Sequence, residues 1–422
     1  MLVDENFKQR LRRLFSVMIP ILITQTAIMA MNFFDSSMSG HAGAVDLAGT
    51  SIGGNIWMPI FVGTNGVLLG AMPIVAHLLG ADKRDNIGKV IRHTIFLAIA
   101  FSAVIILMGV LFLDTLLTHL HLEPQVHYIA KMYMAAFFMS TSLRALIDTL
   151  GHTGITMKIY LLALPVNAFL NYCFIFGKLG MPRLGGVGAG VATGITYWLE
   201  FAIFVWIVHK LPAFEHFRIF KDRFHLDIKQ LRENLSIGVP IGLAMFMEAS
   251  IFGVVALFIA KFGTVIIAAH QAALGFTSLL YMVPLSFSMA LTILVGVEAG
   301  AKRFEEAQKF SRMGIALNMA IAIFLAVLVY TNRPYIAMLY TTDPVIIEKV
   351  VGFLFYAIFF QLFDATAAPI QGILRGYKDV KATFYSGFFA YWVVCLPLGC
   401  FLDFVMEHGP AAYWQSLDIG FF

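Results

Sequence analysis

The sequence predicts an all-α, polytopic membrane protein built from two six-helix bundles, and three observations lead to this fold class. Apolar residues make up 59% of the 422 residues and charged residues only 13%, which is too little polar surface for a soluble protein of this length. The apolar residues form runs of about 20 or more, the length at which a helix crosses a bilayer. The two halves of the chain also resemble each other.

Twelve apolar runs follow one another along the chain, and each predicts a membrane-spanning helix. The first six lie near residues 14–39, 47–79, 94–114, 126–149, 157–178 and 187–209. The next five lie near 235–260, 267–298, 313–331, 346–373 and 383–403. A twelfth begins near residue 411 and is shorter than its counterpart in the first half, so we expect the twelfth helix to be incomplete in this sequence.

The basic residues predict which ends of the helices face the cytoplasm. With the N-terminus in the cytoplasm, 23 of the 29 Lys and Arg residues fall on that side. Such an excess in cytoplasmic loops is the usual pattern of membrane proteins. We therefore expect a multi-pass protein of the cell (plasma) membrane with a cytoplasmic N-terminus, surrounded by the lipid bilayer and acting as a monomer.

An internal repeat divides the chain into two lobes at an offset of 220 residues. Pro20-Ile21 matches Pro240-Ile241, and AGAVDLA at 42–48 matches FGTVIIA at 262–268. Six spans in each half put both lobes in the same orientation, related by a pseudo-twofold axis along the membrane normal. We predict an N-terminal lobe at 1–212, a C-terminal lobe at 235–422, and between them an amphipathic helix at 213–234 on the cytoplasmic interface.

Acidic residues inside the apolar runs are the strongest indication of function. Asp35, Glu248 and Asp364 each lie deep in such a run. A carboxylate in hydrocarbon is costly and persists mainly where it lines a polar pathway. The three acids predict a transporter that binds cations or protons within the membrane. Glu200 is a fourth such acid, which would snorkel to the interface, face a cavity, or be protonated within the helix packing.

Polar residues at a similar depth surround Asp35 in the first half. Asn171 and Thr193 lie about as far from the outer ends of their helices as Asp35 does, and Asn167 is one turn from Asn171 on the same face. One carboxylate, two amide oxygens and a hydroxyl form an all-oxygen set that suits Na⁺, whereas Asp35 alone would suffice for H⁺. Alternatively, the two Asn side chains only join helices to one another.

Several motifs together resemble the multidrug and toxic compound extrusion (MATE) family, and its NorM-type branch in particular. They are Pro20-(x)14-Asp35, AVDLAG at 44–49, LGADK at 79–83, LRGYKD at 374–379, and the acids Glu248 and Asp364. The resemblance covers essentially the whole chain. It implies export of small cationic or amphipathic drugs by alternating access of two lobes, driven by inward flow of Na⁺ or H⁺. It also implies a cation site at Asp35, Asn167, Asn171 and Thr193.

In the second half, the resemblance places Glu248 and Asp364 on a cavity wall, where they would bind a cation, a proton or the substrate. Two neighbouring carboxylates raise each other's proton affinity, so we expect one of them to hold a proton and a bound cation to relieve their repulsion. Na⁺ is expected at Asp35 or at the Glu248–Asp364 pair. Acids satisfied by helix packing are the alternative. Pro20 and Pro240 would bend their helices and couple ion occupancy to helix shape, or form static kinks.

Other functions fit the sequence less well. A lipid-linked oligosaccharide flippase of the same superfamily would want a basic cavity, and we expect the Lys and Arg residues in loops. An intramembrane enzyme would need a paired nucleophile and base or a metal set, and a channel would need rings of polar residues. Nothing predicts nucleic-acid binding, an ATP site or a cofactor beyond the coupling ion, Na⁺ or H⁺.

Overall fold

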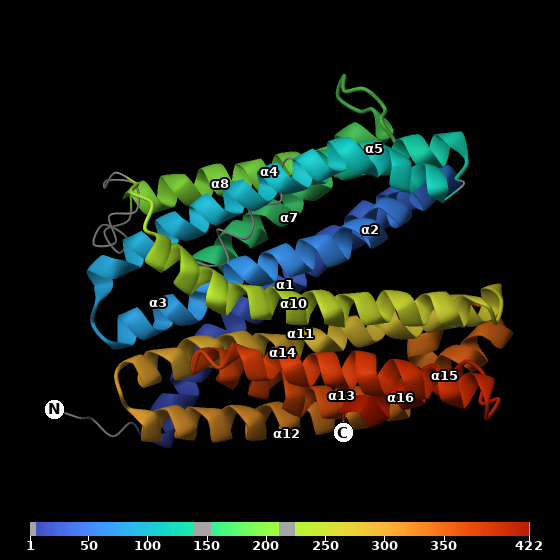
Figure 1. The fold of residues 1–422 in the computed structure, drawn as a ribbon. Helices are drawn as coiled ribbons and strands as arrows, with labels where there is room; N and C mark the ends of the chain where they lie inside the picture. The colour runs from blue at the N-terminus through green and yellow to red at the C-terminus, as the bar shows by residue number, and fades with distance from the viewer. Residues whose placement is uncertain (1–5, 121, 139–152, 211–223, 422) are drawn as a thin grey trace. The chain divides into compact units, whose positions relative to one another are not determined.

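The computed structural model describes residues 6–120, 122–138, 153–210 and 224–421, and every regular element in these ranges is a helix (Figure 1). The first half contains α1 (Phe7–Ala42), α2 (Ala44–Leu69), α3 (Ala71–Gly80), the 3-10 turn η1 (Arg84–Asn86), α4 (Ile87–His119), α5 (Pro124–Phe138), α7 (Thr153–Phe176) and α8 (Gly186–Lys210). The second half contains α10 (Ile228–Ala260), α11 (Thr264–Gly300), α12 (Phe304–Met338), α13 (Pro344–Gly376), α14 (Val380–Phe388), a π-helical segment (Phe389–Cys395), α15 (Leu396–Phe404) and α16 (Ala411–Phe421).

The predicted all-α membrane fold is confirmed. Ten helical stretches in the described ranges are long and apolar enough to cross a membrane, and each coincides with a predicted run. Several begin earlier than predicted. For example, α12 begins at Phe304 because Lys309 and Arg312 continue the helix beyond the apolar run. The fourth predicted run continues past α5 into residues outside the described ranges, and the twelfth corresponds to α16.

The last part of the predicted amphipathic helix, residues 224–234, has a different structure from the one expected. Residues 213–223 lie outside the described ranges, and residues 224–227 are not helical. Asp227 instead caps α10, because its Oδ1 accepts hydrogen bonds from the backbone N–H groups of Lys229 (2.8 Å) and Gln230 (3.3 Å). Residues 228–234 are therefore the first turns of α10 rather than part of a separate interfacial helix.

The internal repeat is visible in the backbone. After α3, the N–H of Ala81 donates to the carbonyl oxygen of His77 and that of Lys83 to Leu78. After α11, at the same offset of 220 residues, Ala301 donates to Val297 and Arg303 to Glu298. Both turns place a non-glycine residue at positive φ, Asp82 at 55° and Lys302 at 60°. The two halves thus build the same turn from different side chains.

The chain forms two compact units whose boundaries fall inside helices. One unit contains Ile23–Gly242 and the other Met1–Leu22 with Leu243–Phe422. The boundaries lie two residues after Pro20 and Pro240, inside α1 and α10, at repeat-equivalent positions. The sequence had predicted the division at the linker.

Each unit has a core that includes half of a helix from the other half of the sequence. In the unit with Leu243–Phe422, Leu14 and Met18 of α1 pack with Phe287 and Phe310. Burial of each such side chain contributes roughly 1.5–3 kcal/mol. In the unit Ile23–Gly242, the first turns of α10 pack beside Leu68. Gly242 is required there, because a Cβ would lie 2.6 Å from the carbonyl oxygen of Gly63.

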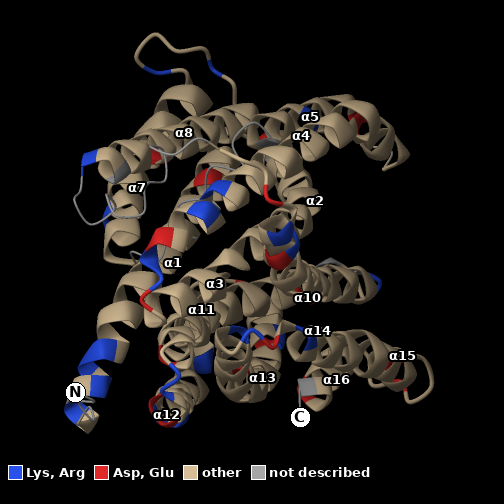
Figure 2. Ribbon diagram, turned by 60° about the vertical axis from the view of Figure 1, so that its left-hand side comes forward, with Lys and Arg blue, Asp and Glu red and all other residues tan. Residues whose placement is uncertain are grey.

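Charged residues are sparse along the helices (Figure 2). Apolar side chains take their place on the surface. In the middle of α4, for example, Leu107, Val110 and Leu111 are all more than half exposed. In water such a surface would be unfavourable, whereas in a bilayer it faces lipid.

Candidate cation-binding sites

Asp35 lies in a buried cluster of oxygen-bearing side chains within the unit Ile23–Gly242. The carboxylate, on α1, is 4% exposed. Its Oδ1 accepts a hydrogen bond from Nδ2 of Asn171 and its Oδ2 accepts one from Oγ1 of Thr193, both at 2.6 Å. These two partners come from α7 and α8, so three helices meet at one carboxylate.

Asn167 completes the cluster from one turn away on α7. Its Nδ2 donates to Oγ1 of Thr193 (3.0 Å), and its Oδ1 accepts from Nδ2 of Asn171 (3.2 Å). Asn167 and Asn171 are both fully buried. Oδ1 of Asn171 has no hydrogen-bond partner in the described part of the chain. The structure therefore brings together all four residues predicted for the first half and leaves one amide oxygen available.

Small residues at the start of α8 allow this arrangement. A Cβ on Gly188 would lie 2.6 Å from the carbonyl carbon of Phe174, so glycine permits α8 to approach α7 closely. Asp46, in the AVDLAG motif, accepts a hydrogen bond from the backbone N–H of Gly186 at 2.6 Å and so holds the first turn of α8. That motif thus supports the helix that carries Thr193.

Sequence analysis missed one neighbour of this cluster. Tyr133, on α5, is buried and close enough to Asp35 to interact with it electrostatically. Tyrosine is common in apolar runs, so nothing in the sequence distinguished this one from a core aromatic residue.

The two acids of the second half also come together, in the unit with Leu243–Phe422. Asp364 of α13 is 4% exposed and Glu248 of α10 is partly buried. The two carboxyl groups interact electrostatically. Tyr281 of α11 and Tyr391 of the π-helical segment lie beside Glu248. The two predicted acids therefore lie near one another, within a larger group of polar side chains.

A basic residue in this group was not predicted. Arg375, expected in a loop, belongs to the last turn of α13, and its guanidinium interacts electrostatically with Glu248. Its Nη2 makes two long hydrogen bonds, 3.4 Å each, to Oγ of Ser288 and Oε1 of Gln371. Its Nε has no hydrogen-bond partner within the described ranges. The sequence signal was Arg375 in the LRGYKD motif, which looks like a loop residue at the end of an apolar run. Its long side chain can reach several ångströms back along the helix, and the motif does not show this.

The remaining predicted residues are placed as follows. Pro20 and Pro240 lie inside α1 and α10, which continue as helices past them. Glu200 on α8 is fully buried. In the part of the chain that the structure describes, no three His, Cys, Asp or Glu side chains come together as a metal site. A Na⁺ site at Asp35 would therefore depend on amide and hydroxyl oxygens.

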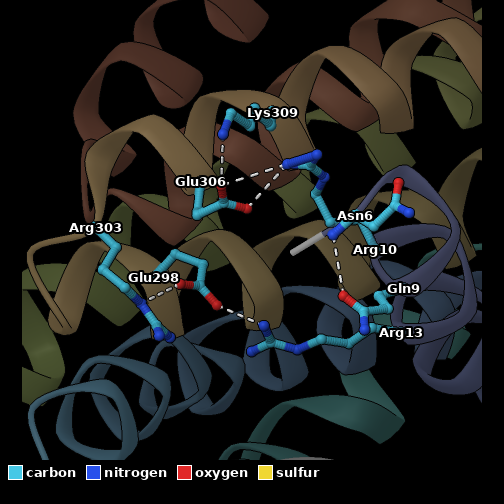
Figure 3. A network of polar contacts seen from close by, with 8 residues as sticks. All are labelled: Asn6, Gln9, Arg10, Arg13, Glu298, Arg303, Glu306 and Lys309. Carbon is cyan, nitrogen blue, oxygen red and sulfur yellow. Dashed lines mark hydrogen bonds and ion pairs between the residues drawn. The ribbon is translucent and has the colours of Figure 1, made fainter. Parts of the chain in front are cut away.

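A separate ionic network lies at the beginning of α1 (Figure 3). Glu298 of α11 is 1% exposed and lies between Nη1 of Arg13 (2.6 Å) and Nε of Arg303 (2.7 Å). Glu306 of α12 lies between Arg10 (3.2 Å) and Lys309 (2.7 Å). These ion pairs join the start of α1 to the α11–α12 hairpin of the same unit.

Comparisons with known proteins agree with this fold. The family model described as MatE matches residues 20–173 and 240–401. A protein of Halalkalibacterium halodurans named "Probable multidrug resistance protein NorM" is 47% identical over 99% of this chain and 92% of its own length. A protein of the same name from Bacillus subtilis is 44% identical over 99% of this chain and 94% of its own length.

Solved structures share the architecture at low sequence identity. A MOP superfamily transporter from Pyrococcus furiosus matches with a TM-score of 0.89 at 18% identity, covering 97% of this chain and 92% of that one. An outward-facing MATE family transporter matches with a TM-score of 0.88 at 18% identity, covering 98% and 92%. The fold is that of a multi-pass membrane transporter. The chain belongs to the MatE family, the multidrug and toxic compound extrusion (MATE) family that its motifs resemble.

Proposed function

We propose that this chain is a secondary multidrug exporter of the cell membrane, with its N-terminus in the cytoplasm. It moves bulky cationic or amphipathic compounds outward by alternating access, in exchange for Na⁺ or H⁺ flowing inward. Relatives named as probable multidrug resistance proteins support the substrate class, since they are 43–47% identical across nearly the whole chain. We expect it to work as a monomer and to catalyse no chemical reaction.

The observation that carries the coupling proposal is the buried Asp35 cluster. An ionised carboxylate is costly in hydrocarbon, and here its two oxygens accept two short hydrogen bonds. These bonds stabilise the negative charge between visits of a cation, because hydrogen bonds to an ionised acceptor are stronger than neutral ones. Among the described residues, Asp35 is therefore held by hydrogen bonds rather than by a basic side chain, which leaves its charge available to a positive species.

The amide of Asn171 supplies a way to respond to that species. At present its Nδ2 donates to Asp35 while its Oδ1 is unpartnered. Rotation of the amide by half a turn would exchange the two atoms. The oxygen would then serve as a ligand for Na⁺ beside Asp35, or accept a hydrogen bond from a protonated Asp35. Binding of either cation would thus turn the Asn171 amide so that its oxygen, instead of its nitrogen, faces Asp35. The contact between α1 and α7 would change accordingly.

In the second half, we propose that Glu248 and Asp364 bind the cationic substrate or a second coupling ion. When both carboxyl groups and the Arg375 guanidinium are ionised, the three side chains carry one net negative charge. A single monovalent cation would balance it. This matches the class of compounds that the proposed exporter carries, because cationic drugs usually bear one positive charge near an aromatic body.

Efflux of ethidium tests the proposal. Cells that express the wild type should retain less dye than control cells, and Asp35→Asn should abolish the difference at equal protein abundance. Asp85→Asn removes an exposed carboxylate in η1 and is the matched control, expected to behave as the wild type. Unchanged dye retention on expression of the wild type would count against drug export and would favour the flippase alternative.

Proteoliposomes loaded with ethidium identify the coupling ion. A Na⁺ pulse at constant pH releases dye if Na⁺ couples, and an acid pulse without Na⁺ releases it if H⁺ couples. Asp35→Asn should remove whichever response the wild type shows. If Asp35→Asn retained that response, Asp35 would have no part in coupling.

A further inference from the structure

A groove runs between the first turns of α12 and the end of α13. It has a volume of about 490 Å³ and its lining comprises Phe304, Gln308, Ser311, Arg312, Ile373 and Tyr377. The four α12 residues are spaced so that they share one face of the helix. Ile373 and Tyr377 pack against the core around Phe287, so one wall of the groove is fixed.

Arg312 is the one cation in this lining, and it differs from the basic residues around it. Arg13 and Arg303 hold Glu298, and Arg10 and Lys309 hold Glu306 (Figure 3). The guanidinium of Arg312 is exposed and makes no ion pair or hydrogen bond with any described residue. It therefore presents an uncompensated positive charge in a form that suits bidentate binding of a phosphate.

The position of Arg312 along α12 corresponds to the level of lipid headgroups. The next 20 residues of the helix contain no charged side chain, and the next one is Arg333. Arg312 therefore lies where α12 enters the hydrocarbon. The positive-inside prediction assigns this end to the cytoplasm, where anionic lipids attract basic residues.

An exposed apolar stripe continues from Arg312 along α12. Ala316 and Ala320 follow Arg312 at steps of four residues, and Ile323, Phe324 and Val327 each lie three or four residues from another member of the stripe. Ile323, Phe324 and Val327 are each more than half exposed. The two alanines nearest Arg312 are exposed and have small side chains, so an acyl chain could lie close to the helix between the groove and these larger side chains. A headgroup site and an acyl-chain track are thus aligned on one helix.

We propose that this groove binds an anionic phospholipid, with its phosphate on Arg312 and one acyl chain along Ala316 and Ala320. The hydroxyl of Tyr377 and the amide of Gln308 lie in the same lining and can donate to the glycerol and headgroup oxygens, whereas the Ser311 hydroxyl already donates to the carbonyl oxygen of Ala307 at 2.8 Å. Free phosphate would use the cation but not the stripe, and a zwitterionic lipid would bring its own positive charge toward Arg312. An anionic lipid fits both features.

Native mass spectrometry of the detergent-purified full chain tests this site. The protein is incubated with dioleoylphosphatidylglycerol or with dioleoylphosphatidylcholine, and the retained lipid is counted. Arg312→Gln should weaken binding of phosphatidylglycerol roughly fivefold, the typical contribution of one basic residue near a membrane surface. Lys381→Gln removes an exposed charge from the first turn of α14, outside the groove, and should not.

A second variant separates a lipid from a free anion. Ala316→Trp places a bulky side chain on the proposed acyl-chain path while Arg312 stays, so it should also weaken phosphatidylglycerol binding. Ala103→Trp on the exposed face of α4 is its control. Equal retention by Arg312→Gln and wild type, or equal retention of the two lipids, would overturn the proposal. Competition by inorganic phosphate with no effect of Ala316→Trp would also overturn it, in favour of an anion site.

Discussion

Arg13 and Glu298 form an ion pair in which the acid is almost completely buried and the base is 30% exposed. The two residues are 285 positions apart in the sequence and join the first turns of α1 to the end of α11. Arg13 also lies 5.3 Å above the ring of Phe310, within the range of a cation–π interaction. One arginine thus fixes the beginning of α1 by charge and by packing.

Arg13→Gln is expected to destabilise the protein by about 1–3 kcal/mol. This lies between the values for exposed and buried pairs, because Glu298 keeps Arg303 as a partner. Thermal unfolding in detergent measures the change. Arg12→Gln is the matched control, since Arg12 is exposed and makes no ion pair within the described ranges. Equal midpoints for the two variants would show that the Arg13–Glu298 pair contributes nothing.

The N-cap of α10 predicts a pH dependence. The Lys89 ammonium, with the N–H groups of Gln230 and Lys229, lowers the pKa of Asp227 to about 2. A lowered pKa stabilises the folded protein wherever Asp227 is ionised. This contribution is complete above the unfolded value of about 4 and is lost as the pH falls from there to about 2.

Asp227→Asn keeps a capping side chain but removes the charge. Its melting temperature in detergent should fall below that of the wild type at pH 6, and the gap should close toward pH 2. Asp85→Asn, which removes an exposed carboxylate from η1 just before α4, should show no such closing gap. A wild-type advantage that stayed constant over this range would mean that the Asp227 charge does not contribute.

The sequence predicted the helices and much of the Asp35 site for definite physical reasons. Run length identified the spans, because the bilayer sets a minimum length of apolar residues. The spacing of Asn167 and Asn171 placed both on one face of a helix. Their contact with Asp35 required the close approach of α7 and α8, which Gly188 allows. The sequence suggested only that Asp35, Asn171 and Thr193 lie at similar depths in their helices, and this does not establish that the helices touch.

Two features were beyond such reasoning because they depend on tertiary contacts. The unit boundaries after Leu22 and Gly242 arise from what each half of α1 and α10 packs against, and no change of composition marks them. Arg375 looked like a loop residue because LRGYKD ends an apolar run. Only the fold shows that its side chain reaches Glu248.

The hydroxyl of Thr193 should be essential for ion coupling. Thr193→Val removes a donor to Asp35 and leaves Nδ2 of Asn167 without its acceptor. The loss of one hydrogen bond to a charged group is worth about 1.5–3 kcal/mol. If H⁺ couples, the H⁺ concentration at half-maximal ethidium efflux should therefore fall about tenfold or more, because the empty, ionised carboxylate has lost a bond that stabilised it and about 1.4 kcal/mol corresponds to a tenfold change. If Na⁺ couples, the Na⁺ concentration should rise instead, because the hydroxyl oxygen is lost as a ligand.

Thr196 provides the control for that variant. It lies on the same helix and is equally buried, but its hydroxyl donates only to the carbonyl oxygen of Ala192, at 2.8 Å. Thr196→Val should leave the ion dependence of efflux nearly unchanged. If both valine variants shifted it alike, the effect would come from α8 packing rather than from the bond to Asp35.

Arg375 should stabilise the acidic pair of the second half. Arg375→Gln leaves the Glu248–Asp364 repulsion uncompensated. Because Glu248 and Arg375 are partly rather than fully buried, we expect a cost of about 1–3 kcal/mol, between the values for exposed and buried charges. We expect a clear fall in the thermal midpoint in detergent. Glu248→Gln combined with Arg375→Gln removes a negative charge along with the positive one, so at least half of the loss should be recovered. A double variant as unstable as Arg375→Gln alone would show that Arg375 acts through Ser288 and Gln371 and not through Glu248.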